Sequence, residues 1–182
     1  MSMGFIVAAL TGIVQQDRFS YVFCFDWHRP RGIVFIIVFL GTSPVFGSLD
    51  LIPELSQFSL TSGNSSNTLF LILLIVLAVG GVALVIWHFV WAYTHNVKQG
   101  FLAYTISRLI ILGLYIAYFF FAAKDSGTTY HLHHYMVGFI VAILAEFNHP
   151  ISLLVLAIGT GIMIQGIAAY DADPIIYVDT SR

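Results

Sequence analysis

Three histidines lie within a run of four residues, at His131, His133 and His134. Two acidic residues, Asp171 and Asp173, follow a later apolar segment. Neutral imidazole and carboxylate are ligands that zinc, iron and manganese accept in proteins. On a helix, His131 and His134 face the same way, whereas His133 points elsewhere. We therefore predict a divalent metal site made by His131, His134, Asp171 and Asp173. The alternative is a polar turn at the membrane surface, where a histidine run meets water and needs no ligand.

Two charges lie within apolar segments of the chain. Arg108 is about two helical turns inside the segment 101–123, and Glu146 is near the end of the segment 130–147. An unpaired charge in the hydrocarbon of a bilayer is costly, and pairing with an opposite charge offsets part of that cost. We predict an intramembrane ion pair between Arg108 and Glu146. The alternative is that Arg108 extends along its helix to reach the lipid headgroups.

A second group of histidines consists of His88, His95 and His149. Two histidines from different helices can clamp a haem. Histidines beside tryptophans at helix ends are more simply explained as residues of the membrane interface, so we do not expect haem.

The composition excludes an ordinary soluble domain. Hydrophobic residues make up 59% of the 182 residues and charged residues 9%, against roughly 25% charged in soluble domains. The net charge of −2 and the lack of a basic stripe argue against nucleic acid as a partner. The single cysteine, Cys24, excludes an internal disulfide. No nucleophilic triad, phosphate-binding loop or dinucleotide fingerprint is present, and the sequence leaves open whether the protein is an enzyme.

Five apolar segments are candidates for crossing the bilayer, which takes about 20 residues in a helix. The segment 32–47 is the weakest, because Gly41 and Pro44 interrupt it. We therefore predict an all-α integral membrane protein with about four transmembrane helices, forming a single multi-pass domain over residues 1–182. The segment Met3–Val14 is too short to cross, and we expect it to lie at the interface or insert partway. The candidate spans are 32–47, 69–91, 101–123, 130–147 and 151–170.

The last two segments should form a helical hairpin, because the break at 148–150 separates them. Gly138 and Ala142 form a small-residue stripe on the first, and Ala157, Gly161 and Gln165 form a similar stripe on the second. Small side chains let helix backbones approach closely. We predict that the two helices pack along these stripes.

Positive charge predicts the orientation of the chain. Alternation of the helices puts Arg18, Arg29, Arg31 and Lys98 on one side and only Lys124 and Arg182 on the other. The side that holds residues 15–31 is therefore predicted to be cytoplasmic. The 61–68 linker and the C-terminus are predicted to be lumenal or extracellular. An N-glycosylation sequon at Asn64 agrees with that assignment.

Three functions fit these features. The first is a small accessory or interaction subunit of a larger membrane assembly, with the lipid bilayer and other membrane subunits as partners. The second is a metal-dependent membrane protein or enzyme that uses the predicted histidine and aspartate site. The third is a transporter that uses Arg108 and Glu146. We favour the first.

Overall fold

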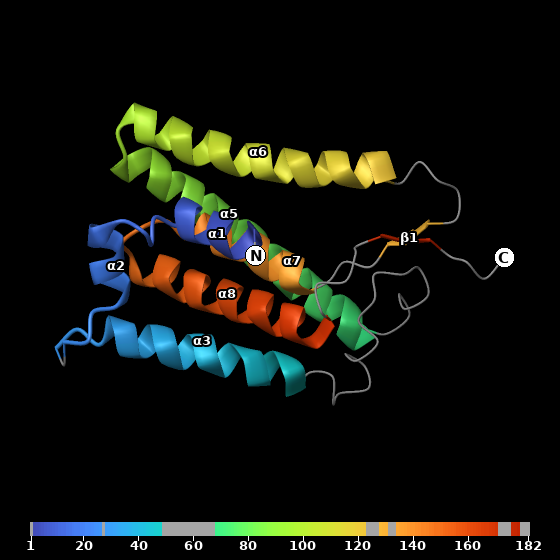
Figure 1. Ribbon diagram of the computed structural model, residues 1–182, viewed down its shortest axis with the longest axis horizontal. Helices are drawn as coiled ribbons and strands as arrows, with labels where there is room; N and C mark the ends of the chain where they lie inside the picture. Colours follow the sequence, from blue (N-terminus) through green and yellow to red (C-terminus); the bar gives the residue numbers. More distant parts are fainter. Residues whose placement is uncertain are drawn as a thin grey trace. The chain divides into compact units, whose positions relative to one another are not determined.

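The computed structural model describes residues 2–26, 28–48, 68–122, 128–130, 134–170 and 176–178 (Figure 1). The fold is all-α apart from one pair of three-residue strands. Among the described helices, four are long and apolar enough to cross a membrane, namely α3, α5, α6 and α8. This confirms the predicted fold class. The elements are α1 (Ser2–Leu10), α2 (Gln16–Val22), α3 (Arg31–Ser48), α5 (Thr68–His95), α6 (Lys98–Ala122), β1 (Thr128–Tyr130), α7 (His134–Leu144), α8 (Pro150–Tyr170) and β2 (Ile176–Val178).

Two elements differ from the sequence prediction. Helix α3 continues through Pro44, which was expected to interrupt it. A proline removes only one backbone hydrogen bond, and helices in membranes tolerate this loss. Helix α7 is shorter than the predicted span 130–147, because Tyr130 belongs to strand β1 and the helix ends at Leu144. Its 11 residues are about 16 Å long, roughly half of the hydrocarbon thickness.

The described structure divides into two compact units. The first contains α1, α2, α3, α7 and α8, and the second contains α5, α6 and the two strands. The prediction of one domain over residues 1–182 stays a prediction.

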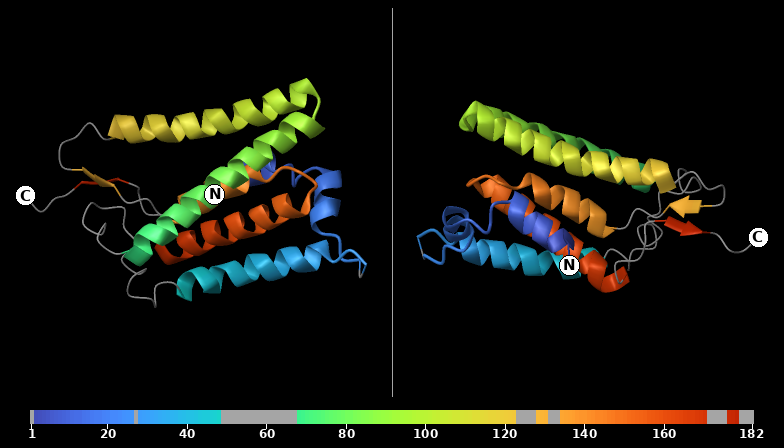
Figure 2. Two further views of the ribbon diagram at one scale, coloured as in Figure 1. Left: turned by 180° about the vertical axis from the view of Figure 1, so that it is seen from behind. Right: turned by 45° about the horizontal axis from the view of Figure 1, so that its top comes forward.

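Helix α8 is the centre of the first unit. It packs against α7 on one side and α3 on another, as two views show (Figures 1 and 2). Of its residues between Pro150 and Ala169, 56% are buried within the chain, against 11% in the spanning parts of α5 and α6. Burial on two sides explains why α8 is apolar around its whole circumference.

The α7–α8 hairpin depends on glycines at its interface. A Cβ atom added at Gly159 would lie 2.6 Å from the backbone nitrogen of Ala142, and one added at Gly166 would lie 2.6 Å from that of Tyr135. The predicted stripe of Gly138 and Ala142 therefore does face α8. This close antiparallel approach is the packing that the sequence predicted.

The predicted stripe on α8 was wrong in one position. Gly161 faces α3 and not α7, because a Cβ there would lie 2.8 Å from the Cβ of Thr42. Gly159, two residues earlier, occupies the α7 face instead. Helix α8 has small residues toward both neighbours, so the sequence spacing alone did not distinguish the two faces.

In the second unit, α5 and α6 form a hairpin, and two pairs of aromatic rings pack between the helices near the turn. The rings of Tyr93 and Phe101 are 5.5 Å apart, and those of Phe89 and Tyr104 are also 5.5 Å apart. Strands β1 and β2 pair in antiparallel fashion, with Tyr130 opposite Ile176 (Figure 2).

Candidate functional site

The predicted metal ligands fall largely outside the described residues. His131, Asp171 and Asp173 are not described, and neither is His133. His134 begins α7, but its side chain is not described. Among the described residues, no three His, Cys, Asp or Glu side chains are grouped so that they could hold a metal ion. The metal site stays a prediction.

Arg108 is buried in the second unit, with 2% of its surface exposed. Its Nη1 donates a hydrogen bond to the Ser107 hydroxyl at 2.9 Å, and its guanidinium lies 4.1 Å from the centre of the Tyr104 ring. Both of these partners lie on α6, the helix of Arg108 itself. Glu146 belongs to the first unit, so the Arg108–Glu146 ion pair stays a prediction.

The α5 histidines have different surroundings. His88 is fully buried, and its Nδ1 is 2.8 Å from the carbonyl oxygen of Leu84, one turn earlier. His95 is exposed and stacks on Trp91, with ring centres 3.7 Å apart. The second arrangement is typical of an aromatic belt at a membrane surface.

Arg18 on α2 is a buried charged residue of the first unit, with 4% of its surface exposed. Its Nη1 donates to the carbonyl of Phe147 and to Oδ1 of Asn148, the latter at 3.2 Å. Its Nη2 donates to the carbonyl of Ala145 at 3.1 Å. We call this arrangement the Arg18 site: the Arg18 guanidinium, the carbonyls of Ala145 and Phe147, the Asn148 side chain and the neighbouring carboxylate of Glu146.

The Arg18 site exists because α7 ends early. Ala142 lies beside Gly159, which places the last residue of α7 about 10 Å along α8 from Pro150. The last carbonyls of a helix have no partners within that helix and carry partial negative charge. Arg18 supplies donors and a positive charge at that point. The Ser152 hydroxyl accepts the backbone N–H of Phe147 at 3.1 Å, and this stabilises the same turn.

Helix α8 begins directly after this turn. Pro150 is its first residue, a favourable position for proline because the first helical N–H needs no partner. His149 precedes it, and its Nδ1 accepts the backbone N–H of Ile151 at 3.2 Å. The side chain of His149 thus caps α8 while Arg18 caps the end of α7.

Electrostatics keep Arg18 charged in this buried position. Burial lowers the pKa of Arg18 to about 10, and the nearby Tyr21 and Glu146 oppose that shift. The guanidinium is therefore protonated at neutral pH. The negative charge of Glu146 raises the pKa of Arg18 and so favours its charged form.

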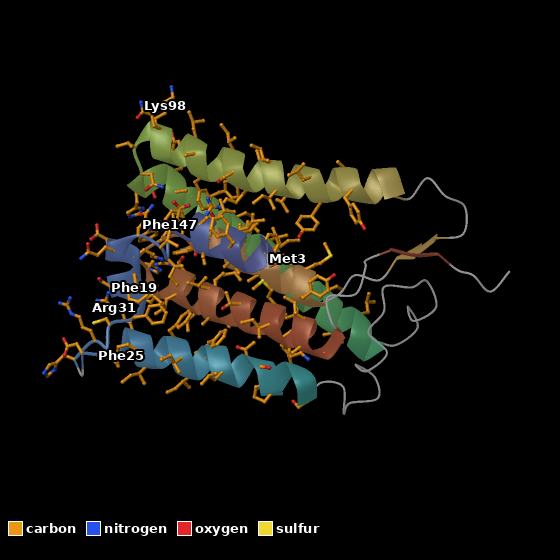
Figure 3. All side chains as sticks on the ribbon, in the orientation of Figure 1. Met3, Phe19, Phe25, Arg31, Lys98 and Phe147 are labelled. Carbon is orange, nitrogen blue, oxygen red and sulfur yellow. The ribbon has the colours of Figure 1, made fainter. Side chains whose placement is uncertain are left out.

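The N-terminal helices position Arg18. Helix α1 ends at Leu10, and the turn after it contains Gly12, whose φ of 67° is a left-handed conformation that residues other than glycine adopt with strain. Helix α2 then packs on α3 through a chain of rings, in which Phe23 lies 4.7 Å from Phe19 and 5.5 Å from Phe35. Figure 3 shows Phe19, Arg31 and Phe147 at the same end of the first unit.

The chain was compared with known families, curated proteins and solved structures. No known protein family matches the chain, and no curated protein or solved structure matches it either.

From the sequence, Arg18 was predicted only to be one of the positive charges that orient the chain. Its neighbours on α2 are mostly exposed and carry no local sign of a buried arginine. The available signal was topological, since alternation of the predicted spans puts the 148–150 break on the same side of the membrane as residues 15–31. That prediction brings the two segments to one membrane face but does not select the arginine.

Proposed function

We propose that this chain is an accessory or interaction subunit of a larger membrane assembly. The observation that carries the proposal is a pair of adjacent glycines, Gly80 and Gly81, in the middle of α5. No atom of the described residues lies within 4 Å of a Cβ added at either position. The flanking apolar residues are exposed, with Val79 at 65% and Val82 at 59%.

Lipid alone accounts for exposed valines but not for exposed glycines. Apolar side chains are as well solvated by lipid tails as by other helices. A glycine within a helix is less favourable than alanine by about 1 kcal/mol in water and contributes no side chain to contacts with lipid. Its benefit in a membrane is the close approach of another helix backbone. We therefore propose a transmembrane helix of another membrane protein as the occupant of this face of α5.

The size of the native complex tests this proposal. Extracted from its own membranes in a mild detergent, the wild-type chain should migrate in a complex larger than a monomer. Gly80→Leu should release it from that complex, because leucine at this position blocks a partner helix. The thermal midpoint of the isolated chain should be unchanged, since nothing within the described structure opposes the new side chain.

Val82→Leu is the matched control. Val82 lies about 200° around the helix from Gly80, so this change should leave the complex intact. A wild-type chain that extracts only as a monomer would contradict the proposal.

The same proposal includes the orientation predicted from charge, with residues 15–31 on the cytoplasmic side. Arg18, Arg29 and Arg31 support it, since positive charges concentrate on that side of membrane proteins.

One observation favours a metal-dependent protein or enzyme as a second candidate. Strand β1 ends at Tyr130, directly before His131, and Tyr130 pairs with Ile176, which follows Asp173 by three residues. This pairing joins the chain next to the predicted histidine ligands to the chain next to the predicted aspartate ligands. Metal analysis of the purified wild type and of His134→Ala tests this candidate. It predicts zinc, iron or manganese in the wild type and a lower stoichiometry in the variant.

A further inference from the structure

We propose that the Arg18 site is a binding site for a small organic cation of the guanidinium class, which the chain fills with its own side chain. The proposal does not depend on the accessory-subunit function. It follows from the oxygen atoms at the α7–α8 turn, from the burial of the two backbone acceptors, and from the element that supplies the arginine.

Three oxygen acceptors converge on one guanidinium. The carbonyls of Ala145 and Phe147 and the side-chain oxygen of Asn148 all accept from its two terminal nitrogens. A planar group with donors in a fixed fork matches such a set, whereas the three donors of an ammonium radiate from a single atom. The site therefore favours guanidinium over a compact cation.

The charge of the turn also favours a cation. The carbonyls of Ala145 and Phe147 lie one and three residues beyond Leu144, the last residue of α7, and the C-terminal end of a helix carries partial negative charge. The carboxylate of Glu146 adds to this field, since it acts on Arg18 electrostatically. Within the described structure, the guanidinium of Arg18 donates its hydrogen bonds to this turn.

The two backbone acceptors of the site are buried, whereas Asn148 is exposed. Ala145 is fully buried and Phe147 is 8% exposed. Loss of the Arg18 side chain would remove the charged donor from both carbonyls, and the carbonyl of Phe147 would keep the hydrogen bond from the backbone N–H of His149 at 2.8 Å. A free guanidinium ion can replace that donor.

Arg18 reaches the turn from a separate short helix. Helix α2 is seven residues long and follows a glycine turn, and it contacts α3 through the Phe19–Phe23–Phe35 rings. The cation is therefore contributed from outside the α7–α8 hairpin that holds the acceptors. In this sense the chain supplies a tethered ligand, and the tether raises the effective concentration of that ligand at the site.

Chemical rescue tests the proposal on the full chain in detergent. Arg18→Ala should lower the thermal midpoint, and guanidinium chloride at about 20 mM, far below denaturing concentrations, should restore at least half of the loss. Potassium chloride at equal ionic strength should not. Binding to the folded state alone produces this stabilisation.

Arg31→Ala is the matched control. Arg31 also stacks on Tyr21, with its guanidinium 4.2 Å from the ring centre, and it comes from the start of the neighbouring helix. Its removal should give no guanidinium-dependent rescue. Arg18→Lys should give none either, because a tethered ammonium still occupies the site.

The outcomes separate cleanly. Rescue of Arg18→Ala by guanidinium and not by potassium supports the site. Equal rescue by both salts, rescue of Arg31→Ala to the same extent, or no loss in Arg18→Ala would overturn it. If Arg18→Ala fails to accumulate, its yield in cells grown with and without guanidinium gives the same comparison, and an unchanged yield counts against the site.

Discussion

The guanidinium of Arg18 donates a hydrogen bond to the backbone carbonyl of Phe147, 129 residues further along the chain. This contact joins the N-terminal helices to the turn of the α7–α8 hairpin. It places a charged donor just beyond the end of α7, and α1, α2 and α3 belong to the same compact unit as α7 and α8.

The stabilising effect of Arg18 should not depend on pH in the neutral range. Burial lowers the pKa of Arg18 to about 10, so the folded and unfolded states are both protonated below that value. Between about pH 10 and the ordinary value for arginine, the unfolded chain binds more protons, and the contribution of this group to stability rises with pH. The difference in thermal midpoint between wild type and Arg18→Ala should therefore be constant from about pH 6 to about pH 9. A difference that changes steadily across this range would contradict a charged Arg18.

Glu146 should couple energetically to Arg18. The structure gives it an electrostatic effect on Arg18, and the sequence predicts a pair with Arg108. Double-mutant cycles with Glu146→Gln measure each coupling, and residues that interact directly give about 0.5–3 kcal/mol. We expect a coupling in this range for Arg18→Ala. A value near zero would remove Glu146 from the Arg18 site, while a coupling to Arg108→Ala would support the predicted ion pair.

Substitution by alanine should have opposite effects on stability at two glycines. Gly159→Ala should destabilise the chain by about 1–3 kcal/mol, because its Cβ would lie 2.6 Å from the Ala142 nitrogen and one backbone must move. Gly113→Ala on α6 should be neutral or slightly stabilising, since no atom of the described residues lies within 4 Å of its Cβ. Thermal unfolding in one detergent compares the two. Equal effects would show that the α7–α8 backbones are further apart than described.

The predicted topology implies that cysteines placed along the chain differ in the side of the membrane from which they can be labelled. Ser65→Cys and Ser181→Cys, each in a Cys24→Ser background, should react with an impermeant thiol reagent from the same side of the membrane. The natural Cys24, which is half-buried, should react from the opposite side. Labelling of Ser65→Cys and Ser181→Cys from different sides would contradict the orientation and the helix count together.

The sequence predicted the transmembrane helices because hydrophobicity is a property of each segment alone. Four long apolar helices correspond to segments that hydropathy selects. It did not predict that α7 stops at Leu144, since that end depends on Arg18 and Ser152, which come from other elements. The sequence also did not predict which face of α8 Gly161 occupies, because α8 has small residues toward both α3 and α7.

Another membrane protein should pack against the side of α5 that carries Gly80, and site-specific photo-crosslinking in native membranes tests this most directly. Val76 is 61% exposed and lies about 40° from Gly80 around the helix, whereas Val82 lies about 200° from Gly80. A photo-reactive side chain at Val76 should give a discrete adduct with a second protein, and one at Val82 should give lipid adducts. Lipid adducts alone at both positions would contradict the proposed function.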